Sequence, residues 1–158
     1  MMNIKKIIII LSFFLLIGCG YEPIYSKKKL EKNHNFSITS IEFEESSEIN
    51  QILLSNLKMF MNIKNKLKLL NLNIKSSTNR TIISKNLKGD AERYLIEINV
   101  NLIIFENEVL KKEFFFKESF NYNSQTNKFN LNLYEKNIKE NLISKISNNI
   151  ILELYSLQ

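Results

Sequence analysis

The stretch RYLIEINVNLIIFENEVLKKEFFFKESFNY, residues 93–122, decides the fold because it contains two long runs of β-type sequence around one short polar break. In both runs, 93–105 and 109–122, apolar residues recur at every second position. This period predicts strands that bury one face of a sheet. The polar break at residues 106–108 predicts a turn, so we expect a long antiparallel β-hairpin.

The side-chain pattern also predicts the register of this hairpin. Directly opposed residues lie on the same side of a sheet, so the two apolar faces meet only if opposed residue numbers add up to an even value. A three-residue loop, Glu106-Asn107-Glu108, gives such a register, whereas a two-residue loop does not. The predicted pairs are Ile98 with Phe116, Val100 with Phe114, Tyr94 with Phe120 and, on the other face, Glu97 with Lys117, while Lys112 is left on the apolar face.

Two further segments predict strands. Residues 36–43, FSITSIEF, are rich in aromatic and β-branched residues, and their alternation slips near Ser40, which indicates a bulge. Residues 70–75 alternate strictly and predict a strand that can resume at residues 81–83 after a polar interruption. The sequence Lys88-Gly89-Asp90 is typical of a turn, and it ends this strand before the hairpin.

Two segments predict amphipathic helices. Residues 44–66 have acidic residues at their start and an apolar spacing that predicts a helix of about 16 to 18 residues. The second helix is longer, with an apolar stripe of Leu131, Tyr134, Ile138, Leu142, Ile146, Ile150 and Leu154. The candidate caps are Ser46 or Ser47 for the first helix and Asn127, Asn130 or an Asn132 and Glu135 capping box for the second.

The order of elements is strand, helix, strand, hairpin and helix, and neither helix stripe can be buried except against the sheet. The sequence therefore predicts an α+β fold, a two-layer sandwich in which two amphipathic helices pack on one face of a roughly four-stranded mixed sheet. We expect this single domain to cover residues 36–158. A domain of this length buries enough surface to fold without disulfides.

The N-terminus has the order of a secretory signal. A short basic segment precedes an apolar run, residues 7–17, which is too short for a spanning helix of about 20 apolar residues. Residues 16–19, LIGC, resemble a bacterial lipobox. We therefore expect that residues 1–18 are a lipoprotein signal peptide, that this peptide is removed, and that Cys19 becomes the lipidated N-terminus.

Cys19 is the only cysteine, and its alternative roles are a buried core thiol or a reactive thiol. A core thiol requires an ordinary core element at the start of the chain, and a reactive thiol requires a histidine partner. His34, the only histidine, lies in a polar run without an acidic neighbour, so we expect a solvated linker residue. Residues 19–35 are then a lipidated N-terminus and tether, and the basic run 27–29 is either solvated or attracted to anionic lipid headgroups.

Charge and composition exclude several classes of function. The chain carries 22 Lys and Arg against 16 Asp and Glu, and loss of Lys5 and Lys6 with the signal leaves a net charge near +4. The basic residues are scattered, without an arginine stripe or glycine-aromatic motif, so we expect no nucleic-acid partner. No nucleophile with a base, metal-ligand cluster or phosphate-binding loop is visible. We therefore expect no enzymatic activity, no metal and no cofactor, apart from the covalent diacylglycerol and N-acyl chain on Cys19.

The order of these segments resembles the LPS-assembly lipoprotein family LptE, particularly its alphaproteobacterial members. The resemblance covers essentially the whole mature chain. Its most similar pieces are Cys19-Gly20 with an aromatic residue, Pro23 and Tyr25 shortly after, Gly89-Asp90 followed by Arg93-Tyr94, and Tyr122-Asn123 before the last helix.

The resemblance implies an outer-membrane lipoprotein on the periplasmic side, which plugs an LptD-like β-barrel and supports the insertion of lipopolysaccharide into the outer leaflet. Gly20 after the lipidated cysteine agrees with sorting to the outer membrane. Cationic groups suit lipid A phosphates. Lys85, Lys88 and Arg93, with Arg80 near them, are the candidate lipopolysaccharide contacts, and the other interpretation is that they are solvated loop charges.

The alternative function is a stand-alone, periplasm-facing lipoprotein that binds a small apolar ligand or shapes the envelope. The outward face at the end of the hairpin is relevant to both functions, since it carries Ile103, Phe105, Val109 and Phe115. These residues form either a partner surface or an apolar group that the chain itself covers.

Overall fold

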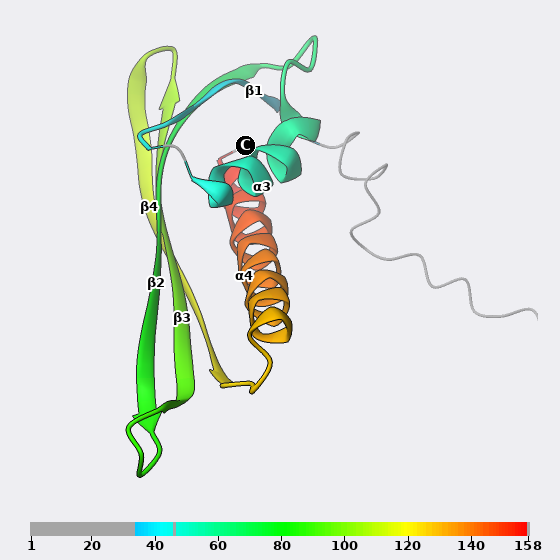
Figure 1. Ribbon diagram of the computed structural model, residues 1–158. Helices are drawn as coiled ribbons and strands as arrows, with labels where there is room; N and C mark the ends of the chain where they lie inside the picture. Colours follow the sequence, from blue (N-terminus) through cyan, green and yellow to red (C-terminus); the bar gives the residue numbers. More distant parts are fainter. Residues whose placement is uncertain (1–33, 46, 158) are drawn as a thin grey trace, which may run out of the picture. The chain divides into compact units, whose positions relative to one another are not determined.

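The chain folds as predicted into a two-layer α+β sandwich, in which helices cover one face of a four-stranded mixed sheet (Figure 1). The computed structural model describes residues 34–45 and 47–157. Its elements are β1 (Phe36–Phe43), α3 (Glu48–Leu57), the 3₁₀ turn η1 (Lys58–Phe60), β2 (Lys68–Lys85), β3 (Ala91–Glu106), β4 (Val109–Asn123) and α4 (Lys128–Ser156). The predicted signal peptide, Cys19 and the tether as far as residue 33 lie outside the described residues.

The sheet has the order β1-β2-β3-β4 and is mixed because β1 runs parallel to β2 while the other neighbours are antiparallel. The register of β1 shifts between Ile38 and Ser40, so the predicted bulge is confirmed, with Thr39 as the extra residue. The Thr39 hydroxyl donates a hydrogen bond to the Leu70 carbonyl oxygen at 3.0 Å. This contact holds the bulge against β2.

The hairpin of β3 and β4 keeps the predicted faces but not the predicted pairs. Its loop is formed by Asn107 and Glu108, whose φ angles of 51° and 65° match a tight two-residue turn. The register then shifts between Ile104 and Phe105, where β4 contains one extra residue. The prediction of a three-residue loop was wrong, because a two-residue loop followed by this bulge brings the same residues onto one face. The observed pairs are Val100 with Phe116, Leu102 with Phe114, Ile96 with Phe120 and Tyr94 with Tyr122.

The charged residues of the hairpin follow this change of register. Glu97 is no longer directly opposite Lys117, but Lys117 Nζ still lies 2.6 Å from Glu97 Oε2 as a diagonal neighbour. Lys112 pairs with Ile104 on the helix-covered face of the sheet, which is the face predicted for it. It remains exposed, and its ammonium nitrogen lies 4.7 Å from the centre of the Phe114 ring, so no charge is buried there.

β2 is one continuous strand of 18 residues, so the predicted interruption over residues 76–80 was wrong. Pairing with β3 extends from Leu70 to Lys85, and the backbone hydrogen bonds of this pairing do not depend on side-chain polarity. The buried Ser76 hydroxyl donates a hydrogen bond to Asn50 Oδ1 at 2.7 Å. A polar residue on the covered face is therefore stabilised by a partner on α3.

α3 begins as predicted and ends earlier than predicted. Ser47 is its cap, and the Ser47 hydroxyl oxygen accepts the Asn50 backbone N–H at 3.4 Å. The helix ends at Leu57 and continues only through η1, so the predicted length was wrong. The Asn62 N–H donates to the Ile38 carbonyl oxygen of β1 at 2.9 Å. This pairing with β1 requires a non-helical backbone, and Asn62 has a φ of 54°.

α4 is the predicted long helix and covers the centre of the sheet. Its cap is Asn127, whose side-chain oxygen accepts the backbone N–H groups of Phe129 and Asn130. The helix buries Leu131, Ile138, Leu142, Ile143, Ile146, Ser147, Ile150 and Leu154, whereas Tyr134 of the predicted stripe is 39% exposed. The buried residues of β2 and β3 in the same core are Leu70, Leu72, Ile74, Ile96, Ile98, Val100, Leu102 and Ile104.

His34 belongs to the core and is only 2% exposed, so its prediction as a solvated linker residue was wrong. Its ring centre lies 4.9 Å from that of Phe36, 5.2 Å from that of Phe60 and 6.0 Å from that of Tyr155. These partners come from β1, η1 and the end of α4. The aromatic cluster therefore joins three segments that are distant in the sequence.

The contribution of α4 to stability can be measured with two leucines of its last turns. Leu154 is fully buried, and Leu152 is 51% exposed. Leu154→Ala should lower the free energy of unfolding by about 2 to 5 kcal/mol, because it removes buried apolar surface and leaves a cavity. Leu152→Ala, the matched control, should lower it by less than about 1 kcal/mol. Equal effects in urea unfolding, followed by circular dichroism, would contradict this packing.

Candidate functional site

The loop that joins β2 to β3 is a tight turn built around Asn86. Its side-chain oxygen accepts the backbone N–H groups of Lys88 and Asp90, both at 2.9 Å. Gly89 has a φ of 89°, a conformation that strongly favours glycine. The turn that Lys88-Gly89-Asp90 predicted is therefore present, and its side-chain contacts position the loop end of the two strands.

The three predicted cationic residues lie together at this turn and are exposed to solvent. Lys85 pairs with Ala91 at the ends of the strands, Arg93 follows on β3, and Lys88 lies in the turn itself. Within the described ranges, Lys85, Lys88 and Arg93 take part in no ion pair at 4.0 Å or less. We call these three residues the cationic tip. Figure 1 shows the loop in green at the lower end of the sheet, past the beginning of α4.

Arg80 is not part of the cationic tip, although the sequence placed it near the same residues. Its Nε donates to the Tyr122 hydroxyl at 3.0 Å and to Glu135 Oε1 at 2.9 Å. The Tyr122 hydroxyl also donates to Glu135 Oε1 at 2.7 Å. The Arg80 guanidinium carbon lies 3.8 Å from the centre of the Tyr94 ring. We call these four residues the Arg80 cluster.

The Arg80 cluster joins β2, β3, β4 and α4 further along the strands from the β2–β3 turn than the cationic tip. Tyr122 is 4% exposed, and burial raises its pKa to about 12. The hydrogen bond to Glu135 adds to this rise in the pKa, and the nearby Arg80 opposes it. Sequence reasoning missed the cluster, because its members come from four elements and no local spacing connects them. Its charges are mutually satisfied, so its role is structural.

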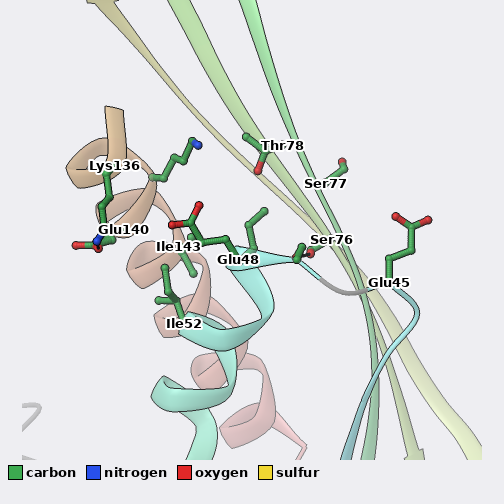
Figure 2. Close-up of a pocket in the computed structure, with 12 residues that line it drawn as sticks. Glu45, Glu48, Ile52, Ser76, Ser77, Thr78, Lys136, Glu140 and Ile143 are labelled. Carbon is green, nitrogen blue, oxygen red and sulfur yellow. Dashed lines mark hydrogen bonds and ion pairs between the residues drawn. The ribbon is translucent and has the colours of Figure 1, made fainter. Parts of the chain in front are cut away.

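A cleft of about 410 Å³ lies between the start of α3, the middle of β2 and α4 (Figure 2). Most of the residues that line it are polar or charged, and these are Glu45, Ser47, Glu48, Ser76, Ser77, Thr78, Lys136, Lys139 and Glu140. Its apolar lining residues are Ile49, Ile52 and Ile143. The walls of the cleft are therefore of mixed character, with nine polar or charged residues beside three isoleucines.

The outward face at the β3–β4 end carries an apolar group, with one change from the prediction. Ile103 and Phe105 are half-buried, and Phe115 is 67% exposed. The bulge places Leu110, not Val109, opposite Phe105, so Val109 does not belong to this face. Leu110 is 59% exposed. The hydrophobic residues Phe115 and Leu110 are thus in contact with solvent.

Residues 34–45 and 47–157 contain neither a metal-ligand cluster nor a helix able to span a membrane. No group of three or more His, Cys, Asp or Glu residues is close enough there to hold a metal ion. No helix in that part of the chain has the length and apolar character needed to cross a bilayer.

No protein-family model and no curated protein matches the sequence. Solved structures do match the fold. Rare lipoprotein B from Shewanella oneidensis has a TM-score of 0.59 and 13% identity, over 77% of this chain and 96% of that chain. The minor lipoprotein from Acinetobacter baumannii has a TM-score of 0.59 and 12% identity, over 76% of this chain and 91% of that chain.

A third match is lipoprotein B from Nitrosomonas europaea, with a TM-score of 0.56 and 8% identity, over 77% of this chain and 84% of that chain. At these identities the likeness establishes the fold alone. The chain therefore has a fold of the class found in bacterial lipoproteins. More narrowly, it has the fold of rare lipoprotein B, the protein also named LptE.

The Arg80 cluster predicts an alkaline dependence of stability. An unfolded tyrosine has a pKa of about 10, and the folded chain raises that of Tyr122 to about 12. The stabilisation from protonated Tyr122 is therefore complete below pH 10 and is lost as the pH rises toward 12. Over this interval the free energy of unfolding should fall by about 2 kcal/mol more than in Tyr122→Phe. Equal falls for the two proteins, in urea unfolding at each pH, would contradict the shifted pKa.

Proposed function

We propose that this protein is an outer-membrane lipoprotein subunit of the lipopolysaccharide translocon, which plugs and supports an LptD-like barrel. The observation that carries the proposal is the fold match to rare lipoprotein B over nearly the whole of that chain. The sequence resemblance to LptE, around the lipobox and the β2–β3 turn, supports it independently. The alphaproteobacterial assignment within that family rests on the sequence resemblance alone.

The uncovered face of the sheet suits a position inside a barrel. The lumen of an outer-membrane barrel is polar and often filled with water. The outward residues of β2 and β3 are mostly amides and hydroxyls, and they include Asn71, Asn73, Ser77, Asn79, Thr81, Asn99 and Asn101. Such a face can contact polar barrel residues and water without burying an unpaired charge.

The cationic tip suits the phosphates of lipopolysaccharide. Lys85, Lys88 and Arg93 are exposed on one turn and have no carboxylate within ion-pair distance in the described part of the chain. Charge-assisted hydrogen bonds to phosphate are stronger than neutral ones, and arginine can make them in pairs. Lipopolysaccharide would meet these groups at the end of the strands.

The anchor of the proposed subunit is the lipidated Cys19. Its diacylglycerol and N-acyl chains hold a protein firmly at a membrane, because a single chain binds only marginally. Gly20 favours the outer membrane, and the domain would then lie on its periplasmic side. The protein acts in this proposal as a binding and assembly subunit, without catalysis, metal or a further cofactor.

The alternative, a stand-alone lipoprotein that binds a small apolar ligand, has less support from the structure. Nine of the twelve residues that line the cleft beside α3 are polar or charged. An apolar ligand would have to desolvate those groups without pairing them, which costs free energy.

The cationic tip gives the first test of the proposal. The triple variant Lys85→Gln, Lys88→Gln, Arg93→Gln should bind purified lipopolysaccharide about tenfold or more weakly, because it loses three charge-assisted contacts. The matched control replaces the exposed Lys58, Lys64 and Lys128 with Gln and should bind as the parent does. Equal binding of the two triple variants would remove the site assignment.

The barrel partner gives the second test. After extraction in a mild detergent, the full chain should co-purify with an outer-membrane barrel in stoichiometric amount. A chain recovered without a barrel, under conditions that preserve known barrel complexes, would contradict the plug and favour the stand-alone lipoprotein.

A further inference from the structure

β4 is an edge strand with a long free side. In the part of the chain that the structure describes, β4 pairs only with β3, and it contains 15 residues. A free strand edge presents unpaired N–H and C=O groups that can pair with another strand. Natural proteins often protect such an edge with lysine, and β4 contains Lys111, Lys112 and Lys117. Here, however, the lysines alternate with acidic residues in a self-complementary order.

The order of residues in β4 is complementary to itself about Phe115. When two copies of the strand run antiparallel with Phe115 opposite its own counterpart, opposite charges face each other and apolar residues face apolar residues. The opposed pairs are Glu113 with Lys117, Lys112 with Glu118 and Phe114 with Phe116, and this regular stretch ends where the bulge of β4 begins at Lys111. Each pair occurs twice because the arrangement is two-fold symmetric. Opposite-charge and aromatic pairs across strands are stabilising.

Neighbouring symmetric registers lack this match. With Phe114 at the axis, Lys112 faces the apolar Phe116, so the charge of Lys112 has no partner across the junction. With Phe116 at the axis, Glu118 faces the apolar Phe114. A shift by a single residue would place the helix-covered face of one copy opposite the uncovered face of the other. The sequence therefore favours the register centred on Phe115.

The ion pairs already present on β4 extend into this arrangement. Lys117 Nζ lies 2.6 Å from Glu97 Oε2, and in the pair it would lie between Glu97 and Glu113 of the second copy. On the helix-covered face, Lys145 Nζ lies 2.7 Å from Glu118 Oε2. Glu118 would then lie between Lys145 and Lys112 of the second copy. Charges of opposite sign thus alternate across the junction on both faces.

We propose that two copies of this chain pair through their β4 edges about a two-fold axis at Phe115, which joins two four-stranded sheets into one. The helices of both copies lie on the same side of the joined sheet, because the register pairs covered face with covered face. Pairing also places the two copies of Phe115, each 67% exposed, beside each other. This inference goes beyond the proposed function and does not rest on it.

Charge reversal tests the pairing by a pattern that only this two-fold register produces. Glu113→Lys places Lys opposite Lys117 twice, and Lys117→Glu places Glu opposite Glu113 twice. Each variant alone should therefore raise the dimer dissociation constant about tenfold. An equimolar mixture of the two variants should recover the affinity of the parent, because both junctions of the mixed dimer are then complementary.

The measurement is sedimentation velocity of the full chain in mild detergent over a range of concentrations. Lys58→Glu is the charge-reversal control, since Lys58 is exposed on η1 and lies outside β4, and it should leave the dissociation constant nearly unchanged. A parent protein that stays monomeric throughout, or a mixture that dimerises no better than the single variants, would overturn the proposal.

Disulfide formation tests the register directly. In a Cys19→Ser background, Phe115→Cys places the only thiol beside its own copy, within the reach of a disulfide. Lys117→Cys, the control, separates the two thiols by four residues, about 13 Å along the strands. Mild oxidation and non-reducing electrophoresis should show a dimer for Phe115→Cys only. Equal cross-linking at both positions, or none at residue 115, would overturn the register.

Discussion

The packing of α4 on the covered face of β2 and β3 is the interaction on which the rest of the structure depends. Ile146, Ile150 and Leu154 of α4 are fully buried, and they share one core with the inward residues of β3 from Ile96 to Ile104. Only this face has helices packed on it in the described chain, so the other face must be compatible with water or a polar partner. β2 and β3 also extend past the beginning of α4, which leaves the cationic tip exposed (Figure 1).

Local patterns predicted the elements, whereas long-range contacts decided where they end. The fold class, the β1 bulge, the Ser47 and Asn127 caps and the stripe of α4 follow from spacing and capping chemistry within a few residues. The length of α3 does not, because the chain leaves the helix to pair with β1. His34 has no periodic signal, and its burial depends on Phe60 and Tyr155. The hairpin showed a third limit. The alternation of apolar residues predicted which residues share a face, but a three-residue loop and a two-residue loop followed by a bulge give the same faces.

The candidate site was predictable only where its residues lie close together in the sequence. Lys85, Lys88 and Arg93 lie together because they flank a turn that the sequence indicates. Arg80 was placed near them by sequence distance, but on its strand it faces α4 and binds Glu135 and Tyr122. That cluster fixes the lower part of the sheet to the helix. The cationic tip is consequently presented on a supported scaffold, and this is the physical basis on which a lipopolysaccharide contact is proposed.

Amide hydrogen exchange of the intact protein tests most directly whether α4 holds one continuous sheet. The account predicts the slowest exchange in β2 and β3 beneath α4, and protection within residues 76–80 of β2 at the alternate N–H groups that point toward β3. The turn around Asn86 should exchange rapidly. Rapid exchange of every N–H group in residues 76–80, or protection in β3 that is unchanged when α4 is destabilised, would contradict the account.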